Sequence, residues 1–397
     1  NTTASYITAV GEKALSANTT GAKNTALGRA TLQAITTQSN NTAVGYNALS
    51  GGSNTGSDNT AVGMDALTST TTGIQNTAVG SIALDANTTG SSNTAVGEGA
   101  LSANTTASNN VAIGQDALQS NTTGANNTST GVNSLGSNTT GASNVAVGFL
   151  ALDANTTAAE NTAVGTSSMS ATTTGASNAA FGTDSLAANT TGASNTALGA
   201  YSLDANTTAS NNTAVGVHSL GANTTGTDNT AVGESSGAAV TTGINNTLIG
   251  AESGDAITDA DHNTAVGFRS LSTNVLGSRS IAIGAGALFA QNPASAADMY
   301  NVGIGYEAGV AVTTGVRNTL IGGLSGDANT TGGDNVSVGA NSLSANTTAS
   351  NNTAVGSASL ITNTTGAGNT GLGNSALYAN TTAANNTAVG YQSLYTN

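Results

Sequence analysis

The chain has 397 residues and a formal net charge of −14, with only 7% charged and 3% aromatic residues and no Cys or Trp. Its hydrophobic fraction of 37% is below that of ordinary globular chains, so a conventional globular core is excluded. The lack of Cys excludes disulfides and cysteine-based metal or thiol chemistry. We expect no binding of nucleic acid, because six Lys and Arg face twenty Asp and Glu, and no membrane insertion, because no long apolar run occurs.

One short repeat runs through the chain. The glycine that closes each NTAVG-like motif recurs from Gly11 to Gly390 in 23 copies, at twenty intervals of 17 residues, one of 18 and one of 21. With this glycine as position 1, the repeat is G-x-x-[AS]-L-x-A-N-T-T-[GA]-[AS]-[SN]-N-T-A-V. We predict a single continuous repeat array over 1–397, in which the coil 284–305 carries a four-residue insertion.

The period predicts the fold class. A repeat of two helices needs about 33 residues or more, so 17 residues are too few. Two short strands and two turns would fit, and each coil would then pair with the next at about 4.8 Å. The sequence therefore predicts an all-β protein, a parallel β-solenoid (β-roll) of 23 coils.

The variation between copies gives a first interpretation of inside and outside. Position 15 is mostly Thr or Val and position 17 is apolar, and residues two apart on a strand point the same way. We interpret both as interior positions together with Leu at position 5, and positions 2 and 3 as exposed. The glycine at position 1 predicts a corner with positive φ, and Asn at position 14 predicts a ladder of hydrogen-bonded side chains.

The small size of this core predicts partner chains. Burying about three large side chains in each coil, at about 1.5–3 kcal/mol each, barely offsets the entropy cost of ordering the coil. We therefore expect a homo-oligomer. The shared repeat position of Asn1 and Asn397 would also allow head-to-tail stacking of chains.

Two segments, 233–267 and 305–339, are duplicated pairs of variant coils. Four position-5 residues are glycines in place of the usual Leu: Gly237, Gly254, Gly309 and Gly326. In each pair the usual Ala at position 16 becomes a leucine, Leu248 or Leu320. This exchange indicates volume compensation between positions 5 and 16, which we expect to meet in one packed layer. Because position 16 points away from 15 and 17, we expect a neighbouring chain to supply that layer.

No catalytic, cofactor or metal site is predicted, and we expect no enzyme. Ser235 lies in a GESSG string, but a nucleophile elbow needs a strand before it and a helix after it. His218 and His262 fall at a variable surface position and in a turn. The densest acidic cluster consists of Glu252, Asp255, Asp259 and Asp261. It could bind Ca²⁺ through carboxylate oxygens, although we favour a solvated turn.

The inserted coil and the scattered aromatic residues are candidates for recognition. The insertion contains Pro293, the only Pro of the chain, beside Phe289, Met299 and Tyr300. We weigh an exposed contact site against a bulge that packs on itself, and favour the bulge. Aromatic residues also occupy position 2 of five coils, where we favour simple surface residues over a glycan platform: Tyr46, Phe149, Phe268, Tyr306 and Tyr391.

The strings NNVAIG at 109–114, SNVAVG at 143–148 and SRSIAIG at 278–284 resemble the head repeats of trimeric autotransporter adhesins. The NTAVGxxALxxNTTG form is also similar to repeats of phage tail fibres and bacterial surface fibres, and the resemblance covers essentially the whole chain. It implies a left-handed parallel β-roll built from three chains, hence a homotrimer. The longer period and the lack of a coiled-coil stalk and anchor barrel depart from the adhesins, so we do not expect anchoring by that route.

These observations favour a structural subunit of an extracellular fibre or filament on a cell or virion surface, with an adhesive role toward a cell-surface or glycan receptor. One alternative is a phage tail-fibre shaft whose receptor-binding part lies elsewhere. Another is an ice-binding β-solenoid with rows of Thr. Neighbouring threonines such as Thr19 and Thr20 argue against it, because only one of two adjacent residues on a strand points outward. A polysaccharide-degrading solenoid acting through Asp255 or Asp259 is the least favoured.

Overall fold

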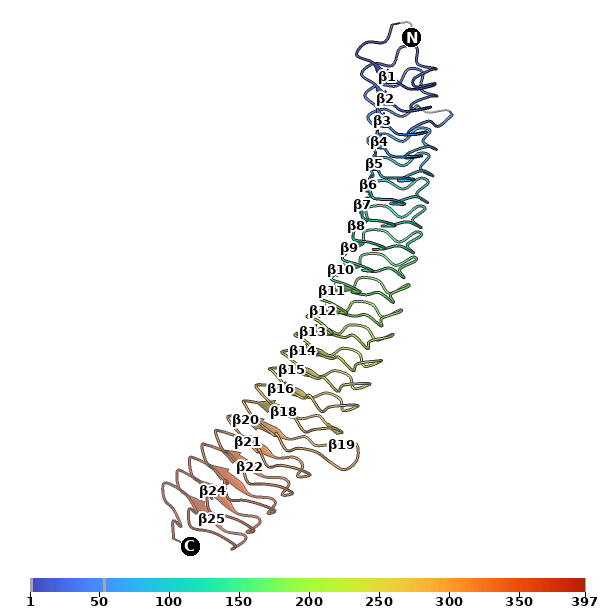
Figure 1. The fold of residues 1–397 in the computed structure, drawn as a ribbon. Helices are drawn as coiled ribbons and strands as arrows, with labels where there is room; N and C mark the ends of the chain where they lie inside the picture. The colour runs from blue at the N-terminus through green and yellow to red at the C-terminus, as the bar shows by residue number, and fades with distance from the viewer. Residues whose placement is uncertain (1–2, 53–54, 397) are drawn as a thin grey trace. The chain divides into compact units, whose positions relative to one another are not determined.

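The computed structural model describes residues 3–52 and 55–396, which excludes the terminal Asn1 and Asn397 and their predicted stacking. The chain forms two compact units, 1–195 and 196–397, each a stack of coils with one short strand per coil on the same side (Figure 1). No helix occurs in the described residues. The predicted all-β parallel solenoid with a 17-residue period is confirmed. The single continuous array over 1–397 stays a prediction.

The first unit contains eleven strands of three residues each. They are β1 Thr8–Val10, β2 Thr25–Leu27, β3 Thr42–Val44, β4 Thr60–Val62, β5 Thr77–Val79, β6 Thr94–Val96, β7 Val111–Ile113, β8 Thr128–Thr130, β9 Val145–Val147, β10 Thr162–Val164 and β11 Ala179–Phe181. Each strand pairs in parallel with the next, and equivalent repeat positions lie side by side, as Ala95 does with Ala112. The register between coils therefore follows the repeat.

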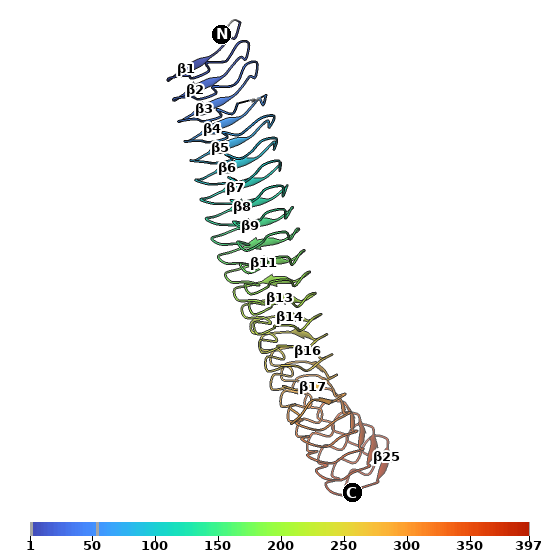
Figure 2. The same ribbon diagram turned by 90° about the vertical axis from the view of Figure 1, so that its right-hand side faces the viewer.

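The second unit contains twelve such strands and two shorter ones. They are β12 Thr196–Leu198, β13 Thr213–Val215, β14 Thr230–Val232, β15 Thr247–Ile249, β16 Thr264–Val266, β17 Gly277–Ser278, β18 Ile281–Ile283, β19 Ala297–Asp298, β20 Val302–Ile304, β21 Thr319–Ile321, β22 Val336–Val338, β23 Thr353–Val355, β24 Thr370–Leu372 and β25 Thr387–Val389. Figure 2 shows both sets of coils from the side. Two strands per coil were predicted, and most described coils have one.

Glycine at position 1 ends each strand at a corner that only glycine fits. Gly131 has φ of +139°, and a Cβ placed on it would lie 2.3 Å from the carbonyl oxygen of Gly148 in the next coil. An L-residue would be strained by both the backbone angle and the contact. The prediction of a glycine corner with positive φ is therefore confirmed.

The core lies on the opposite side of the strand from the predicted one. Ala95 at position 16 and Leu101 at position 5 are both fully buried, whereas Thr94 is half-buried and Val96 is exposed. Positions 15 and 17 therefore point outward, and position 16 points into its own coil rather than toward a neighbouring chain. The interior is so narrow that alanine is the residue that fits beside leucine. The predicted contact between positions 5 and 16 is confirmed, since a Cβ on Gly237 at position 5 would lie 2.7 Å from Cδ1 of Leu248 at position 16.

The remaining turns depend on residues in the left-handed backbone region. Leu101 has φ of 54°, and the leucines of the other described coils are similar. This conformation costs about 1–2 kcal/mol for a residue with a Cβ, while full burial of a leucine yields about 1.5–3 kcal/mol. Burial therefore outweighs the backbone cost. Because many other residues of the turns also have positive φ, a second regular strand does not form.

Two columns of buried asparagines connect the coils. At position 14, the Asn127 backbone N–H donates to Asn110 Oδ1 at 2.8 Å, and Asn110 Nδ2 donates to the Gly124 carbonyl oxygen at 2.9 Å. At position 8, Asn104 Nδ2 donates to Asn87 Oδ1 at 2.9 Å. These bonds satisfy backbone groups that the turns leave without strand partners. The predicted asparagine ladder at position 14 is confirmed, and a second ladder lies at position 8.

The inserted segment of coil 284–305 folds back onto its neighbour. β17 pairs in parallel with β19, and Pro293 and Met299 are buried. The Met299 side chain lies against Gly277, where an added Cβ would be 3.0 Å from Met299 Cγ. Residues 294–296 remain exposed. The insertion is therefore mainly a self-packed bulge, as favoured from the sequence.

Candidate interaction surface

The outward side of the strands forms a continuous uncharged face within each unit, which we call the strand face and define as positions 15 and 17 of the repeat. Position 17 supplies its large apolar side chains. Those at least 36% exposed in the first unit are Val10, Leu27, Val79, Val96, Ile113, Val147 and Phe181, and in the second unit Leu198, Ile249, Ile283, Val355, Leu372 and Val389. Position 15 adds threonines, with valine or isoleucine in some coils.

This face has no partner in the isolated chain. Sheets made only of parallel strands are almost always covered on both faces. Here the inner face is covered by Leu at position 5 and the outer face is exposed. The described three-residue strands contain no charged residue. Exposed apolar surfaces of this kind are commonly sites of contact with other molecules.

Charged residues lie on the turns instead. Arg29 pairs with Glu12 at 3.1 Å and Arg317 pairs with Asp334 at 2.6 Å, each pair joining adjacent coils. Exposed pairs of this kind contribute only about 0–1 kcal/mol each. Because these ion pairs lie on the turns, the strand face stays free of charge.

Sequence reasoning missed the strand face because it placed positions 15 and 17 inside. A signal was present in the repeat. Position 17 accepts Val, Leu, Ile, Phe and, at Thr130, a polar residue, whereas position 16 is Ala, Ser or Gly in 21 of 23 copies and Leu only in two coils that have Gly at position 5. A position that accepts a large residue only where a large neighbour is missing is the more tightly enclosed one. Size tolerance, rather than hydrophobicity, distinguishes the two sides.

The structure brings Ser235 and His218 to one hollow without joining them. The hollow is also lined by Asp204, but no hydrogen bond links Ser235 to His218 in the described contacts. The His218 ring instead stacks on Tyr201, with centroids 5.1 Å apart. Ser235 lies in a turn with φ of 54°. The strand–turn–helix setting of a nucleophile elbow is not formed here.

The acidic cluster is divided among separate partners. Glu252 pairs with Arg269 at 2.5 Å, Asp255 accepts a hydrogen bond from Ser272 at 2.5 Å, and Asp261 accepts one from the Ile244 N–H at 2.8 Å. Across residues 3–52 and 55–396, no group of three or more His, Asp or Glu could hold a metal ion. His262 lies in a turn with φ of 59°, as the sequence indicated. A calcium site involving Asp259 has no geometric support.

The Asn-Thr-Thr triplets have a structural role. The asparagines, such as Asn104, are buried in the position-8 ladder. The first threonine donates its hydroxyl to the next coil, as Thr88 Oγ1 does to the Thr105 carbonyl at 2.9 Å. The second threonine, such as Thr89, is exposed. As expected, only one of the two adjacent threonines faces water.

Two half-buried carboxylates lie at position 6 of their coils. Burial raises the pKa of Asp85 and of Asp153, although backbone N–H groups partly oppose the shift. One oxygen of each carboxylate is enclosed without a hydrogen-bond partner. These residues were not singled out from the sequence. Enclosed, unpartnered carboxylates disfavour their charged form.

The described residues contain no helix long and apolar enough to cross a membrane. No protein-family model matches the chain, and comparison with curated proteins gives no match. The fold alone therefore assigns the chain, as a parallel β-solenoid repeat protein.

Proposed function

We propose that the chain is a structural subunit of an extracellular fibre on a cell or virion surface, in which copies associate through the strand face. The single observation that carries this proposal is the exposed apolar row at position 17, on the outer face of an all-parallel sheet. A second copy offers a matching surface, because equivalent side chains repeat at the same spacing along each unit.

A homotrimer is the assembly that we propose, in line with the resemblance to adhesin head repeats. Three flat faces around a threefold axis would enclose their apolar rows from water, and closed cyclic symmetry leaves no face unpaired. The mechanism is mechanical. Strand pairing and asparagine ladders hold each coil to the next, while association across the strand face would keep the chains together. Adhesion to a receptor would then use the turns, which stay outside this contact.

The varied size of the residues at position 17 argues against the ice-binding alternative. An ice-binding face presents a regular lattice of similar groups, but this row includes Leu27, Ile113 and Phe181. Variation in size suits a contact between flexible side chains of two proteins better than a match to a crystal lattice. A tail-fibre shaft would use the same association and is covered by the same experiment.

Sedimentation velocity on matched variants tests the proposal. Val96→Lys, Ile113→Lys and Val147→Lys together place three charges on the strand face and should convert the oligomer to monomer. The control is Gln115→Lys, Val132→Lys and Phe149→Lys, which places the same three charges at position 2 of three coils, outside the strand face, and should leave the oligomer intact. Equal behaviour of the two triple variants would contradict association through the strand face.

A further inference from the structure

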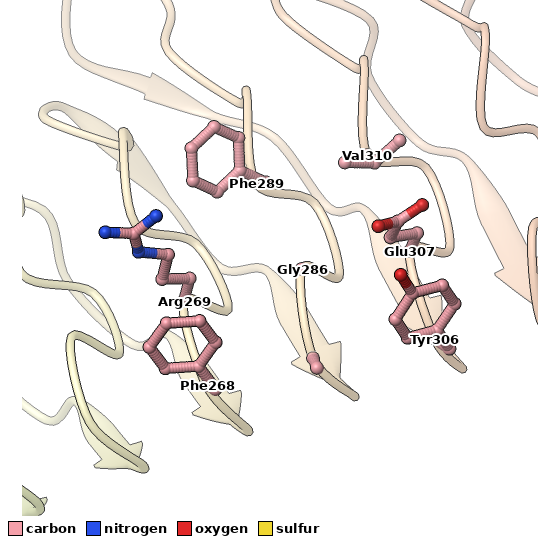
Figure 3. A pocket seen from close by; sticks show the side chains of 8 residues that line it. Phe268, Arg269, Gly286, Phe289, Tyr306, Glu307 and Val310 are labelled. Atoms are coloured by element: carbon pink, nitrogen blue, oxygen red, sulfur yellow. The ribbon is translucent and has the colours of Figure 1, made fainter.

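One hollow of the second unit is lined by aromatic rings. It has a volume of about 330 Å³ and is formed by three consecutive coils that begin at Gly267, Gly284 and Gly305. Phe268 and Tyr306 lie on its two sides, and Phe289 lies above them (Figure 3). No lining residue belongs to the strand face, so the hollow remains accessible when copies associate through that face.

The hollow exists because the middle coil has small residues where its neighbours have large ones. Positions 2 and 3 are Ala285 and Gly286 in the middle coil, Phe268 and Arg269 in the coil before, and Tyr306 and Glu307 in the coil after. Figure 3 shows Gly286 between the two flanking rings. Two other hollows on the turns contain no Phe or Tyr. This combination is therefore distinct from the ordinary groove between coils.

The rings of this hollow lack the stacking partners found elsewhere. Where aromatic residues occupy equivalent positions of adjacent coils, they stack, as Tyr378 does on Tyr395 with centroids 4.7 Å apart. Phe268 and Tyr306 are two coils apart with Ala285 between them. They are 52% and 60% exposed. The parts of these rings that stay exposed to water are favourable surfaces for an apolar face of a ligand.

A hydrogen-bond donor, Arg269, and a carboxylate acceptor, Glu307, lie at the edge of the hollow. The Arg269 guanidinium lies 5.1 Å from the Phe268 ring centroid and pairs with Glu252. On the other side, a hydrogen bond to Glu307 raises the pKa of the Tyr306 phenol. A hydrogen-bond donor and a carboxylate acceptor therefore flank the rings. Ligand sites commonly combine an apolar lining with a few such groups.

We propose that this hollow binds a neutral pyranose unit of a glycan. The C–H face of a pyranose packs on aromatic rings, and its hydroxyls both donate and accept, which suits Glu307 and Arg269 together. A quaternary ammonium ligand is disfavoured, because the Arg269 cation already occupies the vicinity of Phe268. An anionic sugar is disfavoured by Glu307. The span of two coil spacings between Phe268 and Tyr306, about 10 Å, matches two linked pyranose rings.

For its biological role this site rests on the adhesive part of the proposed function, but it can be tested separately. The intact chain is titrated with neutral disaccharides and trisaccharides of glucose, galactose, mannose and N-acetylglucosamine, and binding is followed by calorimetry and by saturation-transfer NMR. We expect at least one of these sugars to bind, and Phe268→Ala or Tyr306→Ala to weaken binding by about tenfold or more, the equivalent of about 1.4 kcal/mol.

Two further variants distinguish sugar binding in this hollow from non-specific binding to exposed aromatic residues. Ala285→Phe fills the gap between the rings and should abolish binding although it adds an aromatic residue. Phe149→Ala removes a position-2 ring that lies in the first unit, outside this hollow, and should leave binding unchanged. Thermal unfolding midpoints confirm that each variant is folded.

The result that would overturn the proposal is binding of none of the neutral sugars, or binding that Phe268→Ala and Tyr306→Ala leave intact. Stronger binding of choline than of every sugar would also overturn it. Sugar binding by a monomeric chain would contradict only the fibre proposal, and an oligomer that binds no sugar would contradict only the glycan site.

Discussion

Leu248 occupies the space that a side chain on Gly237 would need: a Cβ on Gly237 would lie only 2.7 Å from Leu248 Cδ1. The same leucine approaches Gly254 of the next coil, where the corresponding distance to Leu248 Cδ2 is 2.8 Å. Gly237 and Gly254 both have φ near 60°, so these glycines also avoid the backbone cost that leucine bears at position 5. One leucine at position 16 thus fills the space that two leucines at position 5 occupy in the ordinary coils.

This relationship predicts strong coupling between the two positions. Leu248→Ala should lower the free energy of unfolding by about 2–5 kcal/mol, because it leaves a cavity in the core. Gly237→Ala should be destabilising in the natural chain and much less so beside Leu248→Ala, where its methyl group has room. Urea unfolding of the two single variants and the double variant measures the coupling. Additive effects would show that the two residues do not share this space.

The asparagine ladder predicts a local effect of Asn110→Ala. The change leaves the Asn127 N–H without its acceptor, and a buried unsatisfied group costs about 1–3 kcal/mol. The Gly124 carbonyl oxygen loses Asn110 Nδ2 but keeps Asn121 Nδ2 as a donor. Hydrogen exchange at the Asn127 amide should therefore accelerate strongly. Thr106→Ala, which alters an exposed residue of the same coil, serves as the control and should leave that amide protected. Unchanged protection in Asn110→Ala would contradict the ladder.

The corner glycine predicts intolerance to the smallest side chain. Gly131→Ala places a Cβ 2.3 Å from the Gly148 carbonyl oxygen in a backbone conformation that disfavours alanine, so the thermal midpoint should fall. Gly136 lies in the same coil, where an added Cβ would have its nearest neighbour at 3.3 Å. Gly136→Ala should therefore be tolerated. A comparison of the two melting curves checks the prediction, and similar losses in both variants would contradict it.

The raised pKa of Asp153 predicts a pH-dependent effect of its removal. Burial favours the protonated carboxyl in the folded chain, so its stabilising contribution is complete at low pH and is lost as the pH rises through the folded-state pKa. Asp153→Asn should therefore raise the thermal midpoint at pH 7 and have little effect near pH 3, below the usual pKa of about 3.9. A larger benefit at pH 3 than at pH 7 would contradict this sign.

The repeat spacing predicted more of the fold than of the surface. The corner of each coil has no room for a Cβ, so glycine recurs there, as at Gly131 and Gly148. The interval between these glycines was therefore sufficient to predict the length of a coil and the register between neighbouring coils. The exchange between Gly237 and Leu248 correctly predicted a contact. The side of the strand that faces inward was predicted wrongly, because Thr and Val at position 15 fit a dry interior as well as a covered outer face.

The aromatic hollow could not be recognised from position 2 alone. It depends on the combination of large, small and large residues at positions 2 and 3 of three successive coils, with Phe289 contributed from position 6. The self-packed insertion, by contrast, could be predicted from the sequence. Burial of Met299 and Pro293 was favoured from the sequence, because an apolar bulge on a narrow coil has a nearby surface to pack against.

We propose that the strand face is covered by other copies of the chain. Multi-angle light scattering of the unmodified protein over a range of concentrations tests it most directly, because the mass of one chain is 37.9 kDa. We expect a stable species of three times that mass, in which the apolar row at position 17 is protected from solvent. A mass of 37.9 kDa at every concentration would contradict it.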